Sequence, residues 1–421
     1  MKMLKRVIGL SLSGAIAAAA LTGCGQSSVP EPTATIDPSD MAYQVTGLTR
    51  NTTLFTVDGR EVPVEEYLFW LMQAITEQQQ YNYYLLTDES WDGQIEGTPS
   101  KEYLKNDALE TSKLYAVIQN KADEAGLSVT EEDYAEMDAD QAEAEAQLNM
   151  YGSSFQEYLD SQCISEEGFR RQNGVAYLVA DLMDSMGDEL APDDAKMEAF
   201  LDEVGYYNVK HILLSTRHAN EDGTYTDYTD EEKAAVLTEA QGYVSELRAL
   251  PADQVEARFD EIMNERSDDT RNAETGELYY PDGYLTLSGQ MVAEFEEAAL
   301  GLELGEVSDP VETLYGYHII LRLDADTEDT RSVYPDWALS KQLEEWTAAA
   351  EVEVTPEYDA LDPKAVYDKL NEILDARQAE KEAEAAATAT PAPEGSAAPA
   401  ESQAPAPEST SASAPEESPA A

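Results

Sequence analysis

The residues of this sequence best able to do chemistry are two histidines on short apolar stretches. His211 lies within residues 209–214 and His318 within residues 317–323, and the Val, Ile and Leu content of both stretches predicts strands. Their ring nitrogens could hold hydrogen bonds around a reacting group. A histidine flanked by Ile or Leu is ordinarily a core residue, however, so we expect an architectural role first and a catalytic role second.

Other kinds of site chemistry find no support in the sequence. The three histidines do not have the spacing of zinc ligands. The acidic clusters at residues 138–140, 227–232 and 267–269 lack the Asp-x-Asp-x-Asp-Gly order of a calcium loop. Neither Ser-x-x-Lys nor Gly-x-Ser-x-Gly occurs, so hydrolase chemistry is unsupported. We expect no metal and no small-molecule cofactor.

Five landmarks between residues 207 and 325 resemble, in order and at workable spacing, the parvulin-type peptidyl-prolyl isomerases. The first and last are the two histidine-bearing strands. Between them lie Ser267-Asp268-Asp269, then Gly289-Gln290-Met291 followed by Phe295, then Gly305-Glu306-Val307-Ser308 with Thr313. The resemblance implies a small α+β domain with a parvulin-like antiparallel sheet, covering residues 205–326.

The resemblance also implies the reaction and the residues that serve it. Rotation about an X-Pro amide faces a barrier of ~18–20 kcal/mol but breaks no bond, so a catalyst needs an apolar slot for proline and fixed polar groups around the rotating carbonyl. In this family pattern Met291 and Phe295, four apart on an expected helix, form the slot, and the polar groups are His211, Asp269, Thr313 and His318.

The sequence departs from the family pattern at one turn. Where parvulins usually carry Gly-Gly-Asp-Leu-Gly, residues 279–285 read Tyr-Tyr-Pro-Asp-Gly-Tyr-Leu. Asp282 and Gly283 keep a turn, but we expect the tight backbone approach of the glycine pair to be lost. The alternative function is therefore a non-catalytic holdase chaperone whose parvulin domain is inactive.

The first segment has the layout of an export signal. Residues 1–23 carry a basic start, an apolar run too short to span a bilayer, and Leu-Thr-Gly before Cys24. This resembles a bacterial lipobox, in which the cysteine becomes the lipidated N-terminus and anchors the protein to the outer face of the cell membrane. Residues 24–51 are predicted to form a flexible tether. Cys163, which then has no disulfide partner, is expected to be a buried core thiol.

The remaining regions are predicted to be helical or disordered. Residues 52–204 begin with a strand at 54–57 and continue as helices, of which those after Thr130 and Ser165 have good N-caps. Residues 327–378 repeat the helical pattern and are expected to pack on this first region. Residues 379–421, rich in Ala, Pro, Glu and Ser, read as a disordered acidic tail.

This order of elements resembles extracytoplasmic foldase lipoproteins of Gram-positive bacteria and related periplasmic chaperones, in which an all-helical chaperone module carries the parvulin domain as an insert. The implied partners are unfolded or partly folded exported polypeptides, with a homodimer left open. The formal net charge is −60, which excludes nucleic acid as a partner because phosphate binding depends on Lys and Arg. Basic or neutral clients, or a cation-rich wall, would both suit this charge.

Overall fold

The computed structural model describes residues 40–80, 84–85, 87–220, 223–271 and 275–388. The expected signal segment, Cys24, most of the tether and most of the tail lie outside these residues. The chain divides into two units, one ending at Leu370 and the other beginning at Asn371. In the described ranges, no helix combines the length and the apolar character needed to cross a membrane.

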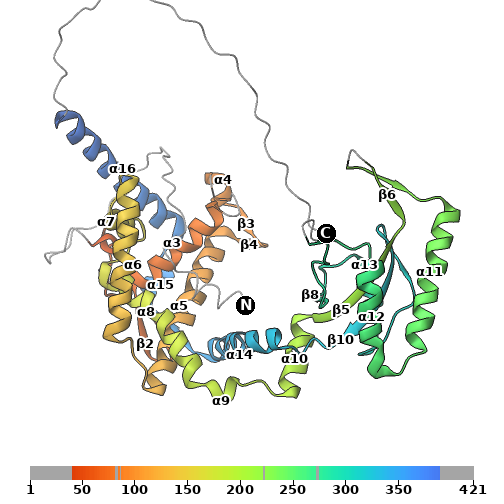
Figure 1. The fold of residues 1–421 in the computed structure, drawn as a ribbon. Coiled ribbons are helices and arrows are strands. Elements are labelled where there is room, and N and C mark those ends of the chain that lie inside the picture. Colours follow the sequence, from red (N-terminus) through yellow and green to blue (C-terminus); the bar gives the residue numbers. More distant parts are fainter. Residues whose placement is uncertain (1–39, 81–83, 86, 221–222, 272–274, 389–421) are drawn as a thin grey trace, which may run out of the picture. The chain divides into compact units, whose positions relative to one another are not determined.

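The first part of the sequence forms a mainly helical module (Figure 1). Its elements are α2 (Met41–Thr46), β1 (Thr53–Val57), β2 (Arg60–Pro63), α3 (Val64–Gln80), α4 (Asp88–Trp91), β3 (Gln94–Ile95), β4 (Thr98–Pro99), α5 (Ser100–Ala125), α6 (Glu131–Met150), α7 (Phe155–Ser161) and α8 (Glu166–Ser185). Thr130 and Ser165 cap α6 and α8 through their hydroxyls, as expected. Gly126 ends α5 in the left-handed conformation, which a glycine adopts without strain.

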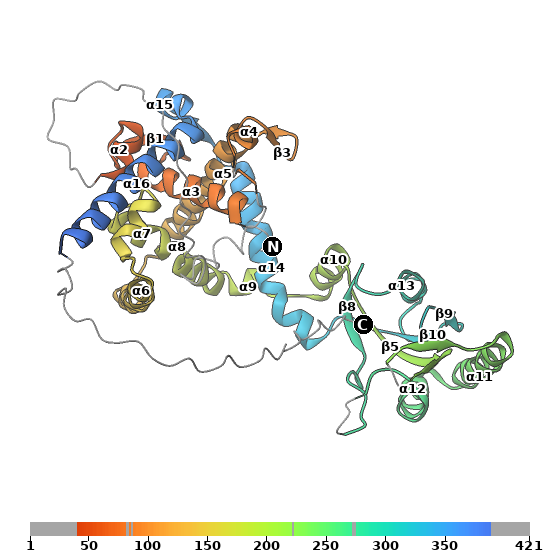
Figure 2. The same ribbon diagram turned by 90° about the horizontal axis from the view of Figure 1, so that it is seen from above.

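The C-terminal part of the chain completes this module. Here α14 (Glu328–Ala349), β11 (Val352–Val354), α15 (Pro356–Ala360) and α16 (Pro363–Thr388) follow one another, and α16 belongs to this unit as far as Leu370. Strand β11 pairs antiparallel with β1, placing Val354 opposite Phe55. The ring of Tyr358 on α15 makes edge contacts with Phe55 at 5.7 Å and with Tyr67 at 5.5 Å. Segments about three hundred residues apart therefore share one sheet and one core (Figure 2).

The ends of this module correct two expectations. The tether was expected to reach residue 51, but α2 is folded, with Asp40 as its N-cap and Met41 only 4% exposed. This segment is folded because the side chains of Met41, Ala42 and Val45 are buried. The disordered tail was expected from residue 379, but α16 continues to Thr388. Its Ala- and Glu-rich composition favours a helix locally, even where no large apolar side chain is present.

Two helices, α9 (Gly187–Leu190) and α10 (Asp194–Val204), connect the helical module to a second module, which begins after α10. The chain returns from the second module through α14. Phe200 on α10 contacts the rings of Tyr334 and Trp337 on α14 at 5.5 and 5.1 Å. The outgoing and returning helices thus pack on each other, which suits an inserted domain.

The inserted module is α+β, which confirms the expected fold class. Its elements are β5 (Tyr206–Ser215), β6 (Arg217–Ala219), β7 (Tyr225–Asp227), α11 (Asp230–Arg248), α12 (Ala252–Arg266), β8 (Tyr284–Leu287), α13 (Ala293–Leu300), β9 (Val311–Glu312) and β10 (Gly316–Leu323). Four strands form an antiparallel sheet in the order β8-β5-β10-β9. The sequence predicted β5, β10 and the three helices, but it did not reveal β8, β9 or the β6–β7 hairpin.

Side chains from the two central strands build a core on each face of this sheet. Ile212, Leu214, Ile319 and Leu321 face α11 and α12, and Tyr207, Val209 and Ile320 face α13. Figure 2 shows β5 and β10 between α12 on one side and α13 on the other. Because side chains alternate along a strand, His211 and His318 fall on the α13 face. Pairing of Ile320 with His211 leaves the two histidines diagonal to each other on neighbouring strands.

Candidate functional site

The two histidines meet at the centre of the inserted module. Their Nδ1 atoms lie 3.1 Å apart, and the rings stack with centroids 5.2 Å apart. Both are buried, His211 at 8% exposure and His318 at 4%. The ladder between β5 and β10 fixes their backbones, so the contact between the rings follows from the register of two strands. The structure therefore brings together two residues that are remote in sequence.

Asp269 reaches the same place from the segment after α12. Its Oδ2 lies 3.2 Å from Nε2 of His211. The segment is held against β5 because Ser267 Oγ accepts from the amide of Leu213 and Asp268 Oδ2 accepts from the amide of Ser215. The amide of Asp268 also donates to the carbonyl of Leu213 at 2.7 Å. Ser267 and Asp268 thus hold the segment against β5, and the carboxylate of Asp269 then lies beside the imidazole of His211.

Thr313 extends the network on the other side of the histidine pair. Its Oγ1 lies 2.9 Å from Nε2 of His318. The same oxygen accepts from the backbone amide of Tyr315 at 3.1 Å. Thr313 follows β9 directly, so the short edge strand positions its hydroxyl beside β10.

These contacts fit a single direction of hydrogen bonding. If His211 donates from Nε2 to Asp269, its neutral ring accepts at Nδ1, and His318 must donate there from its own Nδ1. Nε2 of His318 is then an acceptor, which suits the hydroxyl of Thr313 because that oxygen already accepts from Tyr315. One tautomer of each histidine satisfies every ring nitrogen. The architectural role expected for the pair is thereby supported.

Electrostatics keep the ends of this network in different charge states. Burial, together with the neighbouring His211, lowers the pKa of His318 to about 3, although Asp269 opposes this shift in part. Burial alone would raise the pKa of Asp269, but hydrogen bonds and charge from His211, with the hydroxyl of Tyr284, bring it down to about 2. At neutral pH the site therefore holds a carboxylate and an uncharged His318.

The expected proline slot consists of Met291 and Phe295, and only one of them lies on a helix. Phe295 lies edge-on to both imidazoles, with ring centroids 5.4 Å from His211 and 5.3 Å from His318. It is only 3% exposed, because it packs on Tyr207 and Ile320 in the core. Met291 was expected on the same helix, but α13 begins at Ala293, so Met291 lies in the preceding turn and is half-buried. Phe295 forms a floor beneath the histidines, and Met291 is the more accessible member.

Tyr284 is a site residue that sequence reasoning missed. Its hydroxyl donates to Oδ2 of Asp269 at 2.5 Å, and its ring lies 5.1 Å from that of His211. The ring of Tyr280 lies tilted against that of Tyr284, with centroids 4.4 Å apart. The available signal was the departure from the family turn at residues 279–285, which places tyrosines where parvulins carry glycines.

The tight backbone approach expected to be lost at this turn is present. Gly283 has φ +101°, and a Cβ built there would lie 2.6 Å from the carbonyl oxygen of Val209. Gly283 alone therefore allows the turn to pack closely against β5, although a pair of glycines was expected to be needed for this approach. The departure adds tyrosines to the site without removing this contact.

The other predicted residues lie away from the histidines or outside the described chain. After β5, strands β6 and β7 pair as an antiparallel hairpin, in which Tyr225 is 60% exposed. Cys163 is buried in the helical module, and burial raises the pKa of its thiol to about 12, which confirms a core role. In the part of the chain that the structure describes, no group of three or more His, Cys, Asp or Glu residues could hold a metal ion.

Comparison with known proteins identifies the inserted module. Residues 211–324 match the family described as Rotamase, the PPIC-type PPIase domain. The chain is 32% identical over 184 residues to the foldase protein PrsA of Halalkalibacterium halodurans, covering 40% of this chain and 50% of that protein. It is 24% identical over 276 residues to the chaperone SurA of Chromohalobacter salexigens, covering 59% of this chain and 53% of that one. The chain thus spans about half the length of each of these relatives.

Among solved structures, the crystal structure of the peptidylprolyl isomerase PrsA from Bacillus cereus is similar over 77% of this chain and 99% of that chain. The sequence identity is 17% and the TM-score is 0.28.

Proposed function

We propose that this chain, whose residues 211–324 belong to the PPIC-type rotamase family, catalyses cis-trans isomerisation of X-Pro bonds and assists the folding of exported polypeptides. One observation carries the proposal. Tyr284, Asp269, His211, His318 and Thr313 form an unbroken line of hydrogen bonds across the sheet. A structural core needs no carboxylate held at this position, whereas fixed polar groups beside a rotating carbonyl can favour the twisted amide.

The proposed chemistry is stabilisation of the twisted amide. As the X-Pro bond rotates, its nitrogen loses conjugation and its carbonyl oxygen changes direction, so fixed polar groups can favour the transition state over either ground state. Asp269 supplies a charge whose position is set by two donors. The half-buried Met291 offers an apolar surface for the proline ring, and the buried Phe295 supports the imidazoles from below. Each ~1.4 kcal/mol of preference for the twisted amide gives a tenfold rate increase.

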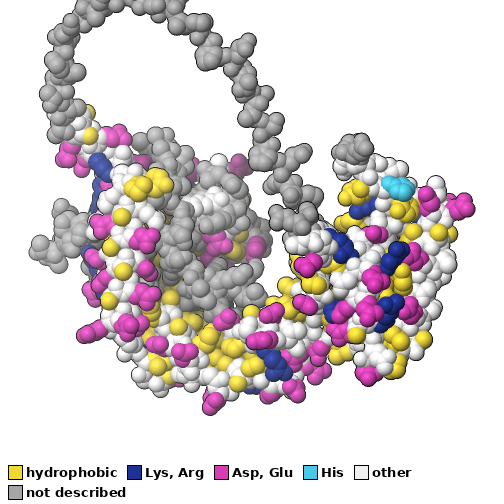
Figure 3. All heavy atoms as spheres, viewed as in Figure 1, with side chains coloured by type: hydrophobic (Ala, Val, Ile, Leu, Met, Phe, Trp, Pro, Cys, Tyr) yellow, Lys and Arg dark blue, Asp and Glu magenta, His cyan; other side chains and the backbone are white. Residues whose placement is uncertain are grey.

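The helical module supports the chaperone part of the proposal. The chain is similar in sequence to proteins named foldase and chaperone, over about half of their length. Acidic side chains are spread over the face shown in Figure 3, where Lys and Arg are few. Such a surface repels other acidic chains and attracts basic segments of unfolded polypeptides.

We place the protein outside the cytoplasm, attached to the cell membrane by lipid at Cys24. The motif Leu-Thr-Gly-Cys after a short apolar run supports this placement. Labelled palmitate in growing cells should enter the full-length protein and should not enter a Cys24→Ala variant. Equal labelling of both proteins would refute the anchor.

The isomerase proposal is tested with the chain lacking residues 1–24. The cis-to-trans relaxation of short X-Pro peptides should be faster than in buffer, and Asp269→Asn should slow it by ~10-fold or more, because a hydrogen bond to a charged group contributes about 1.5–3 kcal/mol. Glu297→Gln, which neutralises an exposed acid on α13, is the matched control and should retain the activity. Wild-type relaxation equal to buffer, with suppression of client aggregation intact, would leave only the holdase.

A further inference from the structure

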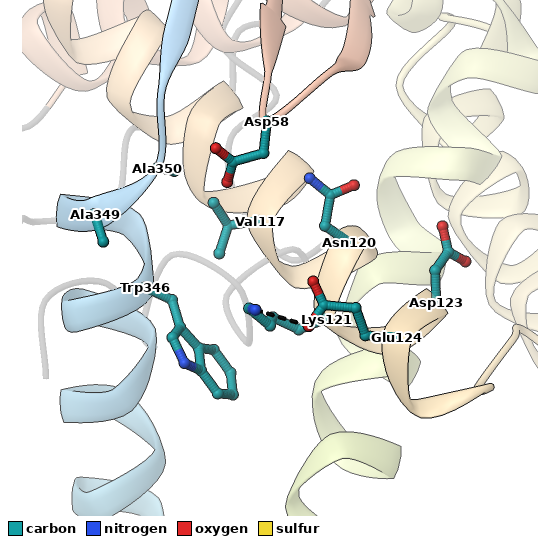
Figure 4. A pocket seen from close by; sticks show the side chains of 9 residues that line it. All are labelled: Asp58, Val117, Asn120, Lys121, Asp123, Glu124, Trp346, Ala349 and Ala350. Carbon is teal, nitrogen blue, oxygen red and sulfur yellow. Dashed lines mark hydrogen bonds and ion pairs between the residues drawn. The ribbon is translucent and has the colours of Figure 1, made fainter.

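The helical module contains a pocket of about 380 Å³ that the isomerase site does not explain. It lies between the last turns of α5 and α14, beside the turn that joins β1 to β2 (Figure 4). Val117 on α5 and Ala349 on α14 supply apolar surface, and Trp346 lines one side with its indole. All of these segments belong to the unit that ends at Leu370.

The charged groups around this indole are mainly acidic. Asp58, Asp123 and Glu124 line the pocket, against one cation, Lys121. Asp123 is paired with Arg60, which comes from β2 and does not line the pocket. The carboxylate of Asp58 accepts from the amide of Glu351, which holds it in place at the turn. The lining therefore combines an aromatic face with an excess of fixed negative charge.

Lys121 shows which ligand chemistry suits this lining. Its Nζ lies 5.4 Å from the ring centroid of Trp346 and 2.8 Å from Oε2 of Glu124. The amine thus stands between an indole face and a carboxylate, the pairing of interactions that recognises an organic cation. Both partners of this ion pair are partly exposed, so the lysine can be displaced by a competing cation.

We propose that this pocket binds an arginine or lysine side chain of an unfolded client polypeptide. The proposal rests on the chaperone part of the proposed function, and it names the class of segment that the helical module selects. An arginine fits best, because a planar guanidinium can lie on the indole of Trp346 while it donates to a carboxylate. The net charge of −60 favours the approach of the same basic segments over a longer range.

The test measures the affinity of labelled unstructured peptides for the chain lacking residues 1–24. One peptide carries a central arginine, and matched peptides carry citrulline or glutamate in its place. The arginine peptide should bind more tightly than the citrulline peptide, and Trp346→Leu should weaken it by about two- to fivefold, the size of an exposed cation–π contact. Trp346→Leu should leave the citrulline peptide unaffected.

Two charge variants separate the pocket from the general acidity of the protein. Glu124→Gln should weaken binding of the arginine peptide, whereas Glu102→Gln, an exposed acid on the same helix outside the pocket, should not. Lys121→Met should strengthen that binding, because it removes the resident cation and frees Glu124.

The proposal that this pocket binds an arginine side chain would be overturned if Glu124→Gln and Glu102→Gln changed the affinity for the arginine peptide equally. It would also be overturned if Lys121→Met weakened that affinity. Suppression of client aggregation and prolyl isomerisation, measured on the same preparations, would then show whether the proposed function still stands.

Discussion

The phenol of Tyr284 donates to Oδ2 of Asp269 at 2.5 Å, on the same oxygen that lies 3.2 Å from Nε2 of His211. Two donors from different strands, β8 and β5, therefore meet on one carboxylate oxygen. Because the oxygen is fixed from both sides, His211 has one favoured tautomer, and the rest of the network follows from it.

Tyr284→Phe tests this relationship. Loss of one donor should raise the pKa of Asp269 from about 2 toward its usual 3.8, and it should lower kcat/KM by ~10-fold, because the carboxylate is less firmly placed. The pKa is measured by NMR titration of the carboxyl carbon, independently of activity. Tyr279→Phe, at a neighbouring exposed tyrosine, is the control. An unchanged pKa in Tyr284→Phe would show that the hydrogen bond contributes nothing in solution.

The burial of His318 predicts a pH dependence of stability. Its folded-state pKa of about 3 is below the unfolded value of 6.5, so between these limits the unfolded chain binds the extra proton. The stabilisation is complete above pH ~6.5 and is lost as the pH falls toward ~3, with a slope of up to ~1.4 kcal/mol per pH unit from this residue.

Urea unfolding across this pH range measures the effect. The carboxylates of the chain add their own dependence, so the informative quantity is the difference between the wild type and His318→Asn. The variant should show the shallower slope. Parallel curves for the two proteins would contradict a strongly lowered pKa.

Gly283 predicts a steric effect on folding. Alanine there would bring Cβ to within 2.6 Å of the Val209 carbonyl oxygen, in addition to the strain of φ +101°. We expect Gly283→Ala to lower the free energy of unfolding by ~2–4 kcal/mol, combining the strain with displacement of the turn. Gly276→Ala controls for the strain alone, because Gly276 also has a positive φ but no atom within 4 Å of a built Cβ. Equal losses in the two variants would show that the close approach is unimportant.

Phe295 predicts a separation of activity from stability. Phe295→Leu and Phe259→Leu both shorten a buried phenylalanine of the inserted module, at 3% and 0% exposure, on opposite faces of the sheet. Each should lower the free energy of unfolding by ~1–2 kcal/mol, because the smaller side chain leaves its surroundings underpacked. Only Phe295→Leu should slow prolyl isomerisation, because only Phe295 touches the imidazoles. Similar loss of activity in both variants would place Phe295 among ordinary core residues.

Much of the local structure could be predicted from the sequence. The hydroxyl caps at Thr130 and Ser165, the glycine after α5 and the apolar composition of β5 and β10 each depend on neighbours in the chain. The order of the landmarks around His211 and His318 was also enough to indicate the family of the inserted module. Local propensity and spacing carry this information because they do not depend on which segments meet later.

Contacts between distant segments were decided only by the tertiary structure. Pairing of β11 with β1, the meeting of Tyr284 with Asp269 and the burial of Phe295 each depend on where a segment lies after the whole chain has packed. A strand of three residues such as β11 has too little pattern to be distinguished from a loop, and it becomes a strand because β1 offers unpaired backbone groups. The sequence alone indicated most of the side chains that could form the site, whereas strand register with burial determined which of them touch and brought Tyr284 to Asp269.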